Sequence, residues 1–173
     1  LVGAGLYWFG KYKTTPGAQL DAPRLWPVAS SVKLTPGRSS LLLFLHPQCD
    51  CSRASLEELK VILNGAPNAS ASIVVEQLDG VPLQGGTWQE NIPGATVFID
   101  KDGVEAKRFG ARTSGQVDLY DAGGRLQFSG GITASRGHAG DNTGRQAVQD
   151  LLAGKPARWD SHAVFGCALV DAS

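Results

Sequence analysis

The sequence has no excess of charge of either sign, and it has few cysteines. Sixteen basic and 16 acidic side chains give a formal net charge of zero. Nucleic-acid binding needs a basic field, so this balance argues against nucleic acid as the main partner. Three cysteines are too few for a disulfide scaffold, and their odd number leaves at least one thiol unpaired unless a metal or another chain binds it. We also find no internal repeat and no phosphate-binding glycine motif.

The rest of the composition is typical of a globular protein. The 173 residues are 42% hydrophobic and 18% charged, which excludes an intrinsically disordered chain and suits one domain with a full core.

Residues 1–10 carry no charge and end in three aromatic side chains, which are followed by Lys11 and Lys13. Ten residues cannot span a bilayer, which takes about 20, but aromatic residues before lysines are typical of the headgroup region. We therefore predict that residues 1–10 end an N-terminal membrane anchor. The lysines count against a periplasmic domain, because positive charge favours the cytoplasmic side. The alternative is a terminal segment of a soluble domain.

Residues 11–38 contain four prolines, which break any long helix, and this range is predicted to be an extended lead-in held to the domain by Trp26. Residues 39–173 then alternate between strand and helix patterns. The apolar run Leu41–Leu45 predicts a central strand that is buried on both faces. The later segments predict a helix ("SRASLEELKVIL"), two strands ("ASIVVEQL" and "ATVFID"), a hairpin ("QVDLYDAGGRLQFSGGI") and a last helix ("NTGRQAVQDLLAG"). This order indicates an α/β domain with a mixed sheet.

A cysteine motif between the first core strand and the next helix resembles the thioredoxin superfamily. The segments "HPQCDCSRAS", "FGARTSG", "LYDAGGRLQFSGGITASRGHAGDNTG" and "VFGC" resemble RedB-like bacterial thioredoxin-fold proteins, and the resemblance covers roughly residues 25 to 169. It implies a thioredoxin-like three-layer α/β/α fold with a mixed central sheet.

The sequence departs from the thioredoxin pattern at two places. Thioredoxins carry Cys-x-x-Cys, whereas aligning Cys49 with the first cysteine puts Ser52 at the second position and Cys51 one residue early. The position of the thioredoxin cis-proline falls near Gly115, in "TSGQV". Both departures argue against disulfide exchange by the ordinary thioredoxin mechanism.

The two neighbouring cysteines are the main candidates for chemistry. A helix N-terminus lowers the pKa of a cysteine placed there, which makes Cys49 the predicted attacking thiolate and Cys51 its resolving partner. Residues two apart in a helix point about 200° away from each other, so a Cys49–Cys51 bond requires Cys49 to precede the helix in a turn. His46 is close enough in sequence to hydrogen-bond a thiol. Arg53 either adds positive charge or points to solvent.

Cys167 follows the last helix, and a returning tail would bring it to the motif. Pairing of Cys167 with Cys49 or with Cys51 is then open. A copper or zinc site formed by Cys49, Cys51, Cys167 and His138 is a further alternative, because thiolates and imidazole suit these ions.

The long polar loop "GGITASRGHAGDNTG" is expected near the cysteines. There Arg136 would be a thiolate partner, and His138 a base or a ligand. Alternatively, the loop holds itself by internal hydrogen bonds, with Asp141 or Asn142 capping the last helix.

Three functions follow. The leading hypothesis is a thiol–disulfide oxidoreductase on the periplasmic side of the bacterial inner membrane, anchored by its N-terminus and acting on protein thiols without a cofactor. The second is a non-catalytic extrinsic subunit of a larger membrane complex. The third is a protein that binds copper or zinc. Fold alone does not choose between them.

Overall fold

The computed structural model describes residues 10–80, 83 and 86–169. Its elements, in chain order, are β1 (Ser40–Leu45), α2 (Ser52–Gly65), β2 (Ser70–Gln77), η1 (Thr87–Gln89), β3 (Ala95–Lys101), α3 (Val104–Arg108), β4 (Gln116–Tyr120), β5 (Leu126–Gly131), α4 (Thr143–Leu152) and β6 (Ser161–His162). The strands form one sheet in the order β3-β2-β1-β4-β5-β6. β1, β2 and β3 are parallel, whereas β4 runs antiparallel to both β1 and β5. The predicted mixed sheet is confirmed.

Strand β1 lies in the middle of this sheet, and all six of its residues are buried. Its Leu43 pairs with Ile73 of β2 on one side and with Val117 of β4 on the other. The continuous apolar run in the sequence therefore reflects a strand that is covered on both faces.

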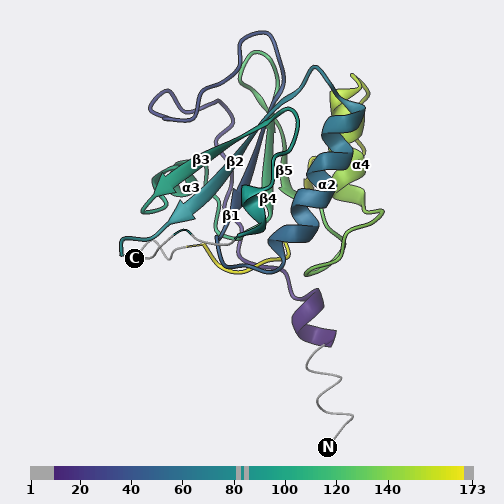
Figure 1. The fold of residues 1–173 in the computed structure, drawn as a ribbon. Coiled ribbons are helices and arrows are strands. Elements are labelled where there is room, and N and C mark those ends of the chain that lie inside the picture. The colour runs from purple at the N-terminus through teal and green to yellow at the C-terminus, as the bar shows by residue number, and fades with distance from the viewer. Residues whose placement is uncertain (1–9, 81–82, 84–85, 170–173) are drawn as a thin grey trace, which may run out of the picture.

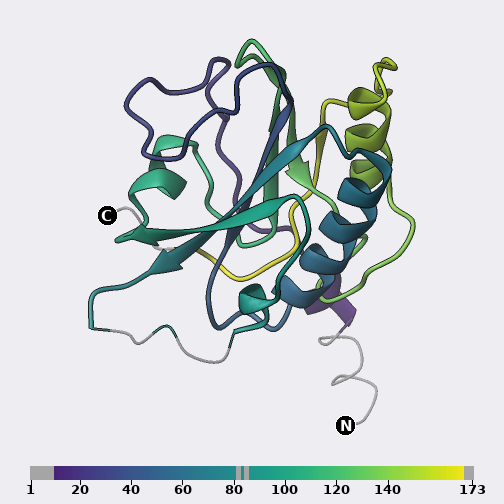
Figure 2. The ribbon, with the colours of Figure 1, turned by 45° about the horizontal axis from the view of Figure 1, so that its top comes forward.

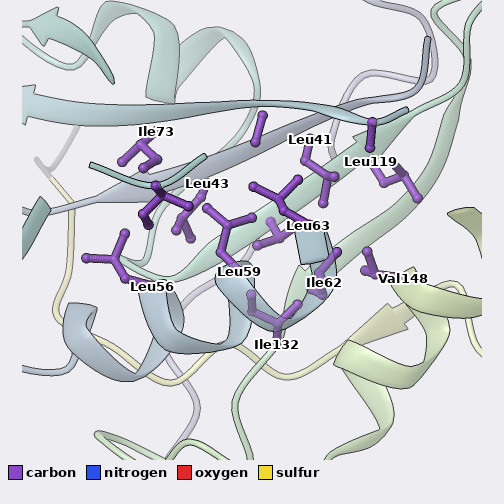
Figure 3. Packing of buried hydrophobic residues seen from close by; sticks show 14 of the residues in the cluster. Leu41, Leu43, Leu56, Leu59, Ile62, Leu63, Ile73, Leu119, Ile132 and Val148 are labelled. Carbon is purple, nitrogen blue, oxygen red and sulfur yellow. The ribbon is translucent and has the colours of Figure 1, made fainter. Parts of the chain in front are cut away.

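Helices α2 and α4 cover one face of the sheet (Figures 1 and 2). Figure 3 shows Leu56, Leu59 and Ile62 of α2 pointing toward Leu41 and Leu43 of β1. Each of these five side chains is at most 1% exposed. Burying an aliphatic side chain of this kind stabilises the fold by about 1.5–3 kcal/mol, so this contact fixes the position of α2 and of the cysteines before it.

Helix α3 and the lead-in cover the opposite face, which completes a three-layer α/β/α arrangement (Figure 1). Trp26 packs edge-on against Phe109 and Tyr120, with ring centroids 5.2 Å and 5.1 Å away. The hydroxyl of Tyr120 donates a hydrogen bond to the carbonyl of Pro23, at 2.9 Å. Trp26 thus holds the lead-in to the domain, as the sequence predicted.

The last helix begins where a cap was expected. The side chain of Asn142 accepts a hydrogen bond from the backbone N–H of Arg145, at 2.8 Å, and so caps α4. Asp141 instead pairs with the guanidinium of Arg145.

Residues 10–14 form a short helix at the end of the molecule where α2 begins (Figure 1). Among the residues that the structure describes, no helix is long and apolar enough to cross a membrane. The predicted anchor falls almost entirely on residues 1–9, which lie outside the described ranges.

Candidate functional site

Two successive turns connect β1 to α2. The carbonyl of His46 accepts a hydrogen bond from the N–H of Cys49, at 3.2 Å, and the carbonyl of Cys49 accepts one from Ser52, at 2.9 Å. Helix α2 starts at Ser52, with Cys51 at the N-cap position. Cys49 therefore precedes the helix in a turn, which is the condition that the sequence set for a bond between Cys49 and Cys51.

The segment between α3 and β4 passes beside these turns. The hydroxyl of Ser114 accepts a hydrogen bond from the N–H of His46, at 3.0 Å, and lies 3.3 Å from the hydroxyl of Ser52. The N–H of Gly115 donates to the carbonyl of Phe44, at 2.8 Å. Ser114 thus joins the end of β1 to the start of α2. The sequence drew attention to Gly115 but not to this buried hydroxyl, since a lone serine carries no pattern.

Gly115 has a φ of +96°, a conformation that favours glycine. A Cβ at this position would lie 3.0 Å from the hydroxyl oxygen of Ser55 in α2. No peptide bond is cis anywhere in the described ranges. A glycine with a trans peptide bond therefore stands where the resemblance places the cis-proline.

The tail after β6 returns to the same place. The N–H of Ser114 donates to the carbonyl of Cys167, at 2.8 Å, and the N–H of Leu169 donates to the carbonyl of Arg112, at 2.9 Å. A Cβ on Gly166 would lie 1.8 Å from the carbonyl oxygen of Ser114, so only glycine permits this approach. These backbone contacts hold the tail so that Cys167 lies near the cysteine motif.

Cys51 and Cys167 both lie near Cys49 at the start of α2, and all three cysteines are free. Burial by itself would raise the pKa of Cys49. Hydrogen bonds from the side chain and backbone N–H of Cys167, followed by those of Cys51, nevertheless lower the pKa of Cys49 below its ordinary value. The thiols and backbone N–H groups of Cys167 and Cys51 thus favour the thiolate form of Cys49.

The other two thiols show the opposite shift. Burial, together with the charge and the hydrogen bond of Cys49, raises the pKa of Cys51. Burial and the same two effects of Cys49 raise the pKa of Cys167 to about 12. Cys49 is only 4% exposed, whereas Cys51 and Cys167 are half-buried. The reduced site thus holds one inner thiol, Cys49, with a lowered pKa, and two outer thiols, Cys51 and Cys167, with raised pKa values.

Known structures share this fold. An uncharacterized conserved protein from Geobacillus kaustophilus is similar at 15% identity, covering 93% of this chain and 96% of its own, with a TM-score of 0.65. A secreted Mycobacterium tuberculosis disulfide oxidoreductase homologous to E. coli DsbE is similar at 18% identity, covering 69% of this chain and 83% of its own, with a TM-score of 0.50. A Neisseria meningitidis protein proposed to be a thioredoxin is similar at 17% identity, covering 80% and 87%, with a TM-score of 0.50.

The fold is thioredoxin-like.

At these identities the likeness concerns the fold. A scan against protein-family models and a search of curated protein sequences each found no match.

In this thioredoxin-like fold, Arg136 lies beside the two outer thiols, and its positive charge acts to lower the pKa of both Cys51 and Cys167. Its guanidinium donates to the carbonyl of Gly166, next to Cys167, and to the carbonyl of Tyr12, at 3.1 Å. It also lies 4.7 Å from the centre of the Tyr12 ring. Arg136 therefore lies near the cysteine motif, and its role as a thiolate partner stays a prediction.

The other predicted site residues have partners or surroundings that do not involve the thiols. Arg53 pairs with Glu57 on the surface of α2, where its side chain is 76% exposed. Nδ1 of His46 accepts a hydrogen bond from the N–H of Gln48, at 3.2 Å, and burial lowers the pKa of His46. His138 is exposed, and its N–H closes a turn to Ser135. The loop at His138 is held in part by its own hydrogen bonds, as the second interpretation of the sequence proposed.

No cluster of three or more His, Cys, Asp or Glu side chains that could hold a metal ion occurs within the described ranges. The set of Cys49, Cys51, Cys167 and His138 is thus not assembled as a metal site.

A buried carboxyl group lies on β4. Asp118 is 0% exposed, and its Oδ1 accepts hydrogen bonds from Gln116, at 3.2 Å, and from Ser129, at 2.7 Å. Its Oδ2 has no hydrogen-bond partner among the residues described. Burial raises the pKa of Asp118 to about 7. Such a group changes its protonation near neutral pH.

Proposed function

We propose that the protein is a thiol–disulfide oxidoreductase on the periplasmic side of the bacterial inner membrane, anchored by its N-terminal segment and acting on disulfides and thiols of other proteins. The observation that carries this proposal is the position of Cys49 in the turn before α2, close to Cys51 and to the returning Cys167, whose thiols and backbone N–H groups lower the pKa of Cys49. A stabilised thiolate with further thiols in reach is what disulfide exchange requires.

The exchange begins with an attack by the Cys49 thiolate on one sulfur of a substrate disulfide. The substrate S–S bond breaks, one substrate sulfur leaves as a thiolate, and Cys49 is joined to the other in a mixed disulfide. A second protein thiol then loses its proton and attacks Cys49, which releases the other substrate sulfur as a thiolate. The substrate gains two electrons, and the protein loses two in forming its own disulfide.

The first step prepares the second. The negative charge of Cys49 helps to hold the protons on Cys51 and Cys167 in the reduced site. That charge disappears when Cys49 enters the mixed disulfide, whereas the positive charge of Arg136 remains. Both outer thiols therefore become more acidic at the moment when one of them has to attack.

An extracytoplasmic location agrees with this chemistry, because disulfides persist in oxidising compartments. One neighbour in fold, the M. tuberculosis disulfide oxidoreductase, is secreted. The uncharged aromatic segment at residues 1–10 supports anchoring.

A redox titration with mass mapping of the thiols tests the proposal. The protein is equilibrated over a range of thiol–disulfide buffers, alkylated, and mapped, with Cys49→Ser as the matched control. We expect a reversible disulfide that includes Cys49, and rapid alkylation at neutral pH that Cys49→Ser abolishes. Thiols that stay reduced at every potential, or a Cys49→Ser variant that is alkylated as fast as the parent protein, would contradict this mechanism.

The low exposure of Cys49 favours a second candidate, a non-catalytic extrinsic subunit of a membrane complex built on the same fold. A cysteine residue that is only 4% exposed meets a large substrate poorly. Glycine in place of the cis-proline also fits a fold that has lost exchange activity. Stable co-purification with a membrane complex that survives Cys49→Ser, together with an unreactive Cys49, would favour this alternative.

A further inference from the structure

We propose that Cys167, rather than Cys51, is the resolving thiol of this site. The inference rests on the proposed function, and it changes the assignment that the Cys-x-Cys motif suggests. It makes the C-terminal tail part of the reacting machinery.

The position of Cys51 disfavours a bond to Cys49. Cys51 already has helical backbone angles, with φ −66° and ψ −21°, and its carbonyl accepts the hydrogen bond of Ala54, at 3.2 Å. The carbonyl of Cys49 is engaged by Ser52 in the same turn. A disulfide needs a specific torsion and a narrow range of Cα separations. Closing one across a single intervening residue would therefore distort the first turn of α2.

Cys167 reaches Cys49 from a different part of the chain. Its own carbonyl is fixed by the N–H of Ser114, and Gly166 lies against the carbonyl of the same serine. From this position the thiol and the backbone N–H of Cys167 are near enough to Cys49 to lower the pKa of its thiol. Two side chains that approach from separate segments can form a disulfide by rotating about their own χ angles, so the turn before α2 can stay intact.

Arg136 adds to the argument. Its guanidinium donates to the carbonyl of Gly166, the residue directly before Cys167. A fixed positive charge beside Cys167 stabilises the thiolate that has to form there. Arg136 is in this role a positioning and electrostatic residue, since it does not itself exchange a bond.

The step balances without any further reactant. The thiolate of Cys167 attacks the sulfur of Cys49 in the mixed disulfide, the bond between Cys49 and the substrate sulfur breaks, and that sulfur leaves as a thiolate. The proton lost by Cys167 passes to solvent or to the leaving sulfur. The product is a Cys49–Cys167 disulfide, with Cys51 remaining a thiol.

The test uses dithiobis(nitrobenzoate), a small disulfide, as the probe. One molar equivalent is added to the full chain and to the matched variants Cys51→Ser and Cys167→Ser. Serine keeps a donor toward Cys49 in both variants. We expect the parent protein and Cys51→Ser to release about two thionitrobenzoate anions per reagent, and Cys167→Ser to release about one. Intact mass should show an adduct only in Cys167→Ser, with a lifetime at least about tenfold longer than in the parent protein. Peptide mapping of the other two proteins should show a link between Cys49 and Cys167.

The outcomes separate the two proposals. An adduct that persists in Cys51→Ser but is resolved in Cys167→Ser overturns the role of Cys167 and leaves the oxidoreductase intact. Absence of any reaction at Cys49 in the parent protein overturns both. Thermal melts of the three proteins establish that each variant is folded, and thiol counts in denaturant establish that every thiol was available.

Discussion

The returning C-terminal tail brings Cys167 close to Cys49, which follows the first strand of the sheet, and hydrogen bonding by Cys167 lowers the pKa of Cys49. This contact depends on Gly166 and Ser114, which bring the tail against the turn before α2. A site of this kind is formed by three separate stretches of chain, and its parts can be tested one at a time.

The donors around Cys49 should control its reactivity. The pKa of Cys49 is lowered, so its alkylation by iodoacetamide should persist at a pH where an ordinary thiol, with a pKa of about 8.5, has largely stopped reacting. Replacing Cys167 by Ala removes the hydrogen-bond donor that lowers the pKa of Cys49 the most. We expect alkylation of Cys49 at pH 7 to slow roughly two- to tenfold, with the midpoint of the pH profile shifted upward. Cys167→Ser, which keeps a hydroxyl donor, should stay close to the parent protein. An unchanged midpoint in Cys167→Ala would show that the tail does not act on Cys49.

Glycine 166 allows the tail to reach the site. The added methyl group of Gly166→Ala would clash with the backbone of Ser114, so the tail has to move. We expect a loss of roughly 1–3 kcal/mol in the free energy of unfolding, together with faster alkylation of Cys167 as it leaves the cluster. The control is Gly65→Ala at the end of α2, where a Cβ meets nothing within 4 Å. Equal effects of the two substitutions on the reactivity of Cys167 would contradict the role of Gly166.

Asp118 should make stability depend on pH. Its pKa rises from 3.8 in the unfolded chain to about 7 in the folded protein. Between these values the folded state holds a proton that the unfolded state has lost, so the free energy of unfolding falls as the pH rises through this window. Asp118→Asn cannot titrate, and between pH 5 and pH 8 the parent protein should lose roughly 2–3 kcal/mol relative to this variant. Urea unfolding at both pH values measures the difference. Parallel pH profiles of the two proteins would rule out a raised pKa at this position.

A buried ion pair holds α4 against α2. Arg145 donates to Glu58 at 2.7 Å, and Glu58 is 2% exposed. Arg145→Ala leaves the buried carboxylate of Glu58 without its charged partner, with the N–H of Gly140 still donating to it, which should cost about 3–5 kcal/mol in the free energy of unfolding. Arg53→Ala breaks the exposed pair with Glu57 on the same helix and should cost less than about 1 kcal/mol. Chemical denaturation of both variants gives the comparison, and similar losses would mean that burial does not set the strength of these pairs.

Much of the fold could be predicted from local patterns. The apolar run at Leu41–Leu45 and the helical spacing of Leu56, Leu59 and Ile62 each report a buried face directly. Asn142 was one of two predicted caps, because short polar side chains accept from the first free N–H groups of a helix. Strand β6 has two residues and pairs with β5. Two residues are too few to show an alternating pattern, so the sequence does not predict this strand.

The site was less accessible to sequence reasoning, because its contacts join distant segments. The spacing of Cys49 and Cys51 pointed to the motif, and the tail was one of several ways to place Cys167. The bridge made by Ser114 had no sequence signal at all. Which of two thiols pairs with Cys49 depends on the three-dimensional position of each, which composition and spacing do not contain.

The short helix at residues 10–14 lies at the end of the molecule that holds the thiols, and Arg136 bonds to the carbonyls of both Tyr12 and Lys13 (Figure 1). One arginine therefore spans the distance between the N-terminal stretch and the tail that carries Cys167. If the proposed anchor tethers that stretch to a bilayer, the end of the molecule with the cysteine motif lies next to the membrane. The anchor would then favour disulfides of membrane proteins near the headgroups over disulfides of bulky soluble proteins.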